Sequence, residues 1–280
     1  MRGGRDDMAA SKLNFELPQR TVSGFVIAGG IIGGIYAGGW IWLCITAALM
    51  LLSMSEYYRM LGRRVKLSKG IGYLCALAVL ISSARWIRPV SIVLTLSLSV
   101  FAIFMIEMLR RQMLGGQSYA IDNVGGTMSG VLFIAVPWTC IALLRDLPTG
   151  TLILVSLFAC TWGCDVMAYF VGKLYGREKL CEFISPNKTI RGFIGGALGS
   201  MFVNSALIYF LRQPPYPLFI IGVICGIAGQ FGDLAESLVK RELGAKDSGN
   251  LIPGHGGVLD RFDSILLNGL LTYLVFGVLM

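Results

Sequence analysis

The sequence predicts an all-α integral membrane protein with about nine transmembrane helices and a cytoplasmic N-terminus. Three observations predict this fold: the composition, the spacing of the charges and their distribution between the two sides. Of the 280 residues, 55% are hydrophobic and 14% are charged, and the mean hydropathy is +0.71. A soluble domain carries roughly 25% charged residues. This composition excludes an ordinary soluble enzyme, a disordered chain and a nucleic-acid-binding domain, so we expect no nucleic-acid partner.

Apolar runs bounded by charge clusters or by Gly and Pro breaks define the helices. The first run, residues 22–54, has no charged residue and is too long for one span, so we expect a break near Gly38-Gly39. The next segment, 70–84, is short for a bilayer, which leaves a count of eight open. The remaining spans are predicted at 90–109, 126–144, 150–172, 192–211, 217–240 and 262–279.

The basic residues predict the orientation. With a cytoplasmic N-terminus, 20 of the 24 lysines and arginines fall on the inner side and only Arg85, Arg88, Arg145 and Arg212 on the outer side. This bias follows the positive-inside rule and accounts for the net charge of +8. The chain then divides into a cytoplasmic tail (1–20), N-terminal membrane helices (21–145) and catalytic membrane helices with a cytoplasm-facing site (146–280).

The cysteines predict no disulfide or metal site, and the first residues predict no signal peptide. The seven cysteines are scattered without a CxxC pair, and six lie in apolar segments. Because cysteine often behaves as a small buried hydrophobe, we interpret them as packing residues and expect neither a disulfide framework nor a zinc site. The polar, basic start lacks the apolar region of a secretory signal peptide.

Polar residues that could do chemistry gather in two segments of the C-terminal half. In the first, Asp165 lies inside an apolar run, where a carboxylate costs on the order of a few kcal/mol unless it meets a cation or a water-filled cavity. We interpret it as a ligand facing a cavity, and a helix-packing salt bridge is the alternative. Ser185, Lys188 and Thr189 follow, just before a glycine-rich helix start that suits a phosphate.

The second segment, residues 231–263, is more specific. Asp233, Ser237 and Lys240 lie at positions i, i+4 and i+7, so one helix face carries all three, with Arg241 close by. This face predicts a polar surface at the inner end of the helix.

A glycine-rich loop follows that helix. It carries Lys246-Asp247 and five glycines, and glycines let backbone N–H groups approach an anion, as in phosphate-binding loops. We expect Gly256 and Gly257 to contact the substrate in this way. The only histidine, His255, is interpreted as a hydrogen-bond donor to phosphate, with a general base as the alternative.

Three carboxylates complete the pattern. Asp260 and Asp263 lie on one side of the start of the last helix, and with Asp233 they can converge on one point at the inner face. Carboxylates bind Mg²⁺, which bridges phosphate oxygens, while Lys and Arg neutralise the remaining charge. The segment therefore predicts attack at a nucleotide phosphate without a covalent nucleophile. A salt-bridged membrane hairpin is the simpler alternative, and it leaves the many glycines unexplained.

These residues resemble the signature of a known family. The signature residues here are Ser237-Leu-Val-Lys240-Arg241, Lys246-Asp247 and Pro253-Gly-His255-Gly-Gly-Val-Leu-Asp260-Arg261-Phe-Asp263. They resemble those of the phosphatidate cytidylyltransferases, also called CDP-diacylglycerol synthases. Upstream similarity covers Asp165, Ala168-Tyr169-Phe170, Gly172-Lys173, Gly176 and Ser185-Pro186-Asn187-Lys188-Thr189. At Arg191 the family pattern usually has a glutamate, so one charge beside the expected phosphate site is reversed.

The resemblance implies a reaction and its requirements. CTP and phosphatidic acid would give CDP-diacylglycerol and pyrophosphate by metal-assisted in-line transfer, at a bacterial inner membrane or an equivalent organelle membrane. Mg²⁺, a second monovalent cation such as K⁺, and a homodimer are also implied. By this resemblance, Asp233, Asp260 and Asp263 correspond to the metal ligands of the family. The implied phosphate contacts are Lys188, Lys240, Arg241, Lys246 and Arg261, while Asp247 and His255 lie in the signature without an assigned role.

Two other classes share some of these features. Transporters also have glycine-rich breaks, such as Gly29-Gly30 and Gly33-Gly34, and a charge inside a span. Their sites lie near the midplane of paired repeats, whereas this sequence places its charges at one surface and shows no repeat. The CDP-alcohol phosphotransferases are excluded because their Asp-x-x-Asp-Gly-x-x-Ala-Arg motif is absent. A cytidylyltransferase is therefore the predicted class.

Overall fold

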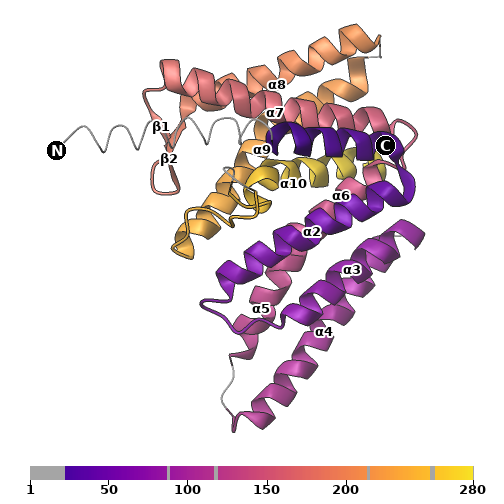
Figure 1. The fold of residues 1–280 in the computed structure, drawn as a ribbon, viewed down its shortest axis with the longest axis vertical. Coiled ribbons are helices and arrows are strands. Elements are labelled where there is room, and N and C mark those ends of the chain that lie inside the picture. Colours follow the sequence, from indigo (N-terminus) through magenta and orange to yellow (C-terminus); the bar gives the residue numbers. More distant parts are fainter. Residues whose placement is uncertain (1–22, 87–88, 117–118, 213–214, 253–255, 280) are drawn as a thin grey trace, which may run out of the picture.

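The computed structural model describes residues 23–86, 89–116, 119–212, 215–252 and 256–279, which form a bundle of helices (Figure 1). The predicted tail (1–20) and His255 lie outside the described residues. The helices are Ser23–Ala37, α2 (Gly39–Leu61), α3 (Lys69–Trp86), α4 (Pro89–Met113), α5 (Ala120–Gly130), α6 (Val136–Leu144), α7 (Gly150–Tyr175), α8 (Ile190–Leu211), α9 (Pro215–Glu242) and α10 (Leu259–Tyr273). Two π-helical stretches, η1 (Val131–Ala135) and η2 (Leu274–Leu279), join α5 to α6 and extend α10.

Every predicted span falls on a helix, which confirms the helical class. Among the described residues, seven helical stretches are long and apolar enough to cross a membrane: Gly39–Leu61, Ile92–Met113, Ala120–Leu144, Gly150–Tyr175, Ile190–Leu211, Leu218–Glu242 and Leu259–Leu279. The apolar helices Ser23–Ala37 and Lys69–Ser83 are shorter. The count of nine spans, the cytoplasmic N-terminus and the division at residue 145 stay predictions.

The first apolar run breaks where the sequence predicts. Gly38 has φ 62° and ψ −161°, a conformation that residues with a side chain rarely adopt, and α2 begins at Gly39. Arg145, after α6, donates from Nε to the carbonyl of Ile35 at 2.7 Å. A Cβ on Gly38 would lie 2.8 Å from Arg145 Nη2. Glycine is therefore required here both for the turn and for the approach of this arginine.

The span formed by α5, η1 and α6 lies in the middle of the bundle. Of its apolar window, 78% is buried, and Trp138 packs edge-on against Phe262 of α10 with ring centroids 5.2 Å apart. Five of the seven cysteines are buried and all seven are unpaired, in line with their interpretation as packing residues. Because α10 packs against both α6 and α9, the two halves of the chain share one core.

Helices α7 and α8 lie side by side and approach each other closely (Figure 1). Gly195 of α8 leaves room for Val171 of α7, and Gly199 leaves room for Met167, since a Cβ on either glycine would collide with that side chain. Small residues at such interfaces are typical of membrane helices, whose association depends on van der Waals packing. This packing holds the ends of the two helices together next to the hairpin that connects them.

That hairpin is an element which the sequence does not predict. Strands β1 (Lys179–Cys181) and β2 (Ser185–Thr189) pair antiparallel between α7 and α8, where only a loop is expected. β1 has only three residues, fewer than the common five to six, and Pro186 is unusual in a strand, so the pattern is weak. β2 leads directly into α8, whose N-cap Thr189 accepts a hydrogen bond from the N–H of Gly192 at 3.1 Å.

Contacts between the loops agree with the predicted sides. Arg59, near the end of α2, donates to the carbonyl of Ser248 in the α9–α10 loop at 3.1 Å, and both are predicted inside. Arg145 and Ile35, which also contact each other, are both predicted outside. Neither of these two contacts joins residues that are predicted on opposite sides of the membrane.

We predict opposite labelling of two exposed loop positions. A membrane-impermeant maleimide should label Asn250→Cys in inside-out vesicles and Thr149→Cys in right-side-out vesicles, each measured against the wild-type cysteine background, because the positive-inside rule places the two loops on opposite sides. The reverse pattern would overturn the orientation, and labelling of both from one side would overturn the span count.

Candidate active site

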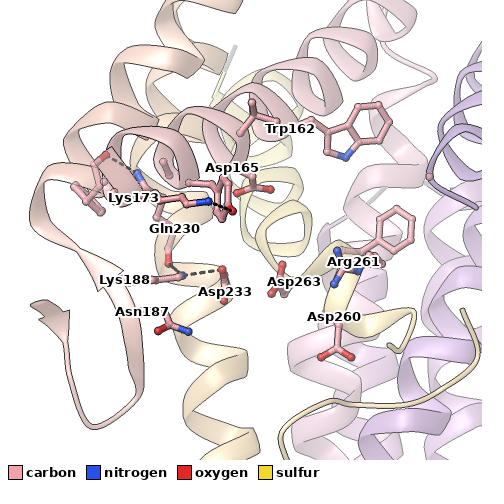
Figure 2. Close-up of a pocket in the computed structure, with 18 of the residues that line it drawn as sticks. Trp162, Asp165, Lys173, Asn187, Lys188, Gln230, Asp233, Asp260, Arg261 and Asp263 are labelled. Carbon is pink, nitrogen blue, oxygen red and sulfur yellow. Dashed lines mark hydrogen bonds and ion pairs between the residues drawn. The ribbon is translucent and has the colours of Figure 1, made fainter. Parts of the chain in front are cut away.

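A cavity of about 1140 Å³ lies between the first helix, α7, the hairpin, α9 and α10 (Figure 2). Its ionisable lining residues are Asp165, Lys173, Lys188, Asp233, Lys240, Asp247, Asp260, Arg261 and Asp263. Apolar residues line another part, among them Phe25 and Ile27 of the first helix and Trp162 and Val166 of α7. Charged groups and apolar surface therefore share one opening in an otherwise apolar bundle.

The cavity collects most of the predicted site residues. Those that line it are Asp165, Lys188, Thr189, Asp233, Lys240, Asp247, Asp260, Arg261 and Asp263. Predicted residues that are described but do not line it are Ser185, Ser237, Arg241, Lys246, Gly256 and Gly257. The position of Asp165 agrees with its interpretation as a ligand facing a cavity.

Lys188 and Asp233 form an ion pair at the wall of the cavity. Lys188 Nζ lies 2.7 Å from Asp233 Oδ2 and 3.4 Å from the carbonyl oxygen of Gln230 (Figure 2). The other oxygen of Asp233 accepts a hydrogen bond from Ser237 at 3.2 Å. These contacts join β2 to α9 and orient Asp233. Both ends of the pair are partly exposed, so an incoming phosphate can reach the ammonium group.

Lys240 is enclosed by carboxylates. Its Nζ lies 2.8 Å from Asp260 Oδ1 and 3.3 Å from Glu236 Oε1, and Glu236 is fully buried. Buried charges persist in proteins when they are paired, because desolvation is costly. Lys240 therefore neutralises two protein carboxylates and joins α9 to α10, so its first role here is to hold the site together.

The glycine-rich loop surrounds the carboxylate of Asp260. The N–H of Ser248 donates to both oxygens of Asp260, at 2.9 and 3.1 Å, and the N–H of Gly257 donates to Oδ2 at 2.8 Å. Gly256 has φ 85°, and a Cβ there would lie 2.8 Å from the same carboxylate. With Lys240 as a further donor, Asp260 is saturated. The anion that these N–H groups hold is the carboxylate of Asp260, whereas we expected a substrate phosphate, so contact of Gly256 and Gly257 with a substrate stays a prediction.

Asp233 and Asp263 remain available to bind a cation. Asp165, Asp233 and Asp263 are close enough for their charges to interact, and they gather around the same part of the cavity (Figure 2). Among the described residues, no three His, Cys, Asp or Glu side chains form a ready metal-binding cluster. Mg²⁺ usually takes one or two carboxylates and completes its shell with water and substrate phosphates. Asp233 and Asp263 fit such an ion, whereas Asp260 is already saturated.

The arginine that departs from the family pattern lies away from the cavity. Arg191 donates from Nη1 to the carbonyl of Tyr175, the last residue of α7, at 3.1 Å. A cation is favourable at a helix C-terminus, where carbonyl groups lack partners. The reversed charge is therefore used to cap α7. Arg241 is likewise structural here, since its Nε donates to the carbonyl of Ile184 in the hairpin at 3.2 Å.

Five polar residues of the site are missing from the sequence prediction. Lys173 and Asn187 line the cavity and belong to the upstream similarity, which gave them no role in the site. Gln230 lines the cavity, and Glu236 contacts Lys240. These two lie three residues on either side of Asp233, so the helical i±3 spacing could have found them. The fifth is Glu56 of α2, which contacts the α9–α10 loop. No local pattern connects it with a loop nearly two hundred residues away.

Comparison with known proteins identifies the family. The sequence profile of the Cytidylyltransferase family matches residues 18–279. A phosphatidate cytidylyltransferase of Staphylococcus haemolyticus is 31% identical over 236 residues, which cover 82% of this chain and 87% of the relative. The chain belongs to the cytidylyltransferase family. The resemblance drawn from the signature residues is thereby confirmed.

Other relatives in this family match mainly over part of the chain. Phosphatidate cytidylyltransferases of Synechocystis sp. and Brucella abortus are 44% and 43% identical, over 131 and 156 residues. These alignments cover 46% and 55% of this chain, and the chain spans 44% and 57% of the length of the two relatives.

We predict that reversing the charge at two nearby positions has different effects on the nucleotidyl-transfer activity expected of this family member. Lys188→Glu should lower turnover by about 100-fold or more, since it replaces a cation at the cavity by an anion beside Asp233. Arg191→Glu should stay within about threefold of wild type, because it loses only one exposed contact to a backbone carbonyl. Steady-state assays of both purified variants test this, and equal losses would show that Arg191 acts in the site.

Proposed function

We propose that this protein is a phosphatidate cytidylyltransferase, which makes CDP-diacylglycerol and pyrophosphate from CTP and phosphatidic acid. The observation that carries the proposal is that one part of the cavity is charged and another part is apolar. Cations and carboxylates from α7, β2, α9 and α10 line one part, and apolar residues of the first helix and α7 line another. A polar nucleotide and a lipid can meet in such a place.

The two substrates divide between these parts. Lys188 and Arg261 supply positive charge for the phosphates, and Arg261 forms no ion pair with any described residue. Phe25 of the first helix is 75% exposed and lines the cavity, so it offers apolar surface to an acyl chain. A phosphatidate head group would then reach the cations while its tails stay in the bilayer, and CTP would enter from the cytoplasm.

The chemistry is an in-line displacement. A phosphate oxygen of phosphatidate attacks the α-phosphorus of CTP, a new P–O bond forms, and the bond to the pyrophosphate leaving group breaks. The nucleophile is already ionised, so no general base is needed. Lys188 and Arg261 neutralise the phosphate charges and orient them in line. Mg²⁺ held by Asp233 and Asp263 would supply Lewis-acid neutralisation of the phosphate oxygens.

The remaining parts of the proposal concern the setting. The excess of basic residues on one side supports a cytoplasmic site in a bacterial inner membrane or an equivalent membrane of an organelle. The resemblance to the family supports a second monovalent cation such as K⁺, and a homodimer. Chemical crosslinking in intact membranes measures the dimer directly.

The proposal predicts that label from CTP moves into lipid. Purified protein in mixed micelles with phosphatidic acid and CTP labelled in the cytosine ring should form a chloroform-soluble product, and EDTA should abolish it. Phosphatidic acid is required for the label to enter the organic phase. Absence of this product from folded protein, across several acyl chains and with Mg²⁺ present, would contradict the proposal.

We also predict that Asp263→Asn lowers turnover by about 100-fold or more, because it removes a charge that faces the cavity while keeping the size of the side chain. The control is Asp122→Asn, the same change at an exposed position of α5, which should leave turnover unchanged. Retention of wild-type turnover by Asp263→Asn would exclude this carboxylate as a cation ligand.

A further inference from the structure

A carboxylate from the N-terminal half contacts the signature loop, which we define as the described residues 247–252 and 256–259. Glu56, on α2, is completely buried. Its Oε1 accepts a hydrogen bond from the N–H of Val258 at 2.9 Å, and its Oε2 accepts from the N–H of Leu259 at 2.8 Å and from Ser248 Oγ at 3.0 Å. One side chain of α2 therefore holds both ends of the loop.

Two of these donors form the N-terminus of α10. Val258 is the N-cap of that helix and has no capping side chain of its own, and Leu259 is its first residue. The first N–H groups of a helix lack partners within the helix, and a negative charge is favourable next to them. Glu56 thus caps α10 from another helix. This contact fixes the position at which α10 begins.

Two glycines of the signature loop make room for this carboxylate. A Cβ on Gly249 or on Gly257 would collide with the carboxylate oxygens of Glu56. Arg59, one turn further along α2, donates to the carbonyl of Ser248 at 3.1 Å. The loop is therefore shaped around α2, and these glycines serve Glu56 in addition to any role toward a substrate.

The loop transmits the position of Glu56 to the cavity. Ser248, which donates its hydroxyl to Glu56, donates its N–H to Asp260, and Gly257 does so from beside the N-cap. The first five residues of α10 include Asp260, Arg261 and Asp263, all of which line the cavity. A shift of the loop would therefore move the arginine and both aspartates relative to α9.

We propose that Glu56 is a positioning residue of the active site: it fixes the signature loop and the first turn of α10, and so places Arg261 and Asp263 opposite Asp233. The proposal rests on the function proposed above. It assigns a role in the reaction to the N-terminal half, whose sequence shows no motif with a recognisable chemistry.

The test is Glu56→Gln. The amide keeps the size of the side chain but loses the charge and presents an NH₂ group to one of the donors, so the loop must shift. A displacement of about 1 Å can cost a factor of about 100 in rate. We expect kcat to fall by about tenfold or more, with the KM for phosphatidate within about twofold, and Glu56→Asp to recover part of the loss because it keeps the charge.

The matched control is Glu107→Gln on α4. Glu107 is also buried and accepts hydrogen bonds from Ser68 at 3.1 Å and Asn123 at 2.9 Å, far along the sequence from the signature loop. Replacing the Glu107 carboxylate by an amide should lower the stability of the protein without changing kcat per folded molecule. Equal kcat losses in the two variants, or an unchanged kcat in Glu56→Gln, would overturn the proposal.

A second readout does not depend on the reaction. Hydrogen–deuterium exchange at the amides of Ser248, Gly257, Val258 and Leu259 should be faster in Glu56→Gln than in wild type, and unchanged in Glu107→Gln. Unchanged exchange in both variants overturns the positioning role even if the wild-type protein proves inactive with phosphatidate, an outcome that contradicts only the proposed function. If Glu56→Gln does not fold, Ser248→Ala removes one of the three donors, and we expect faster exchange at the same amides with a kcat loss of about threefold.

Discussion

Lys240 places one positive charge between two carboxylates inside an apolar bundle, and the arrangement of the site depends on this contact. Without Lys240, Glu236 and Asp260 would both lose their ion-pair partner, and removing one partner from a buried pair costs about 3–5 kcal/mol. The pair joins α9 to α10. Asp260 then gathers the N–H groups of the signature loop, and Glu56 holds the same loop from the opposite side. The charged groups of the signature thus divide into those that build the site and those that face its substrates.

The fold follows from local patterns, which is why most of it can be predicted. Apolar runs between charge clusters predict where the helices lie, although α2 extends to Leu61 and α5 begins at Ala120, both several residues beyond the predicted runs. Gly38 marks the break in the first run because few other residues adopt its conformation. Part of the site is equally local. Helical spacing places Asp233 and Lys240 on one face of α9, and Asp260 and Asp263 on one side of α10. These spacings bring the three aspartates and Lys240 to the cavity, although Ser237, on the same predicted face of α9, does not line it.

What each of these residues does there depends on contacts between distant parts of the chain. A glycine-rich loop beside cations predicts a phosphate, yet its N–H groups are occupied by Asp260 and Glu56, and the second of these comes from α2. Lys240 and Lys188 look alike in the sequence and both line the cavity, but Lys240 contacts two carboxylates, whereas Lys188 contacts one, that of Asp233, and is more exposed. In the sequence, Arg191 reverses a charge beside the expected phosphate site, whereas in the structure its side chain caps α7. No local pattern distinguishes these cases.

A double-mutant cycle on Lys240 and Asp260 tests the central claim most directly. The free energy of unfolding in mixed micelles is measured for Lys240→Met, Asp260→Asn and the double variant. The control cycle combines Lys240→Met with Asp122→Asn, at an exposed aspartate of α5 that does not line the cavity. If the pair joins α9 to α10, the coupling energy should be about 1–3 kcal/mol, and the control cycle should be additive within about 0.5 kcal/mol. Additivity of the Lys240 and Asp260 variants would contradict the account, because the two residues would then contribute independently.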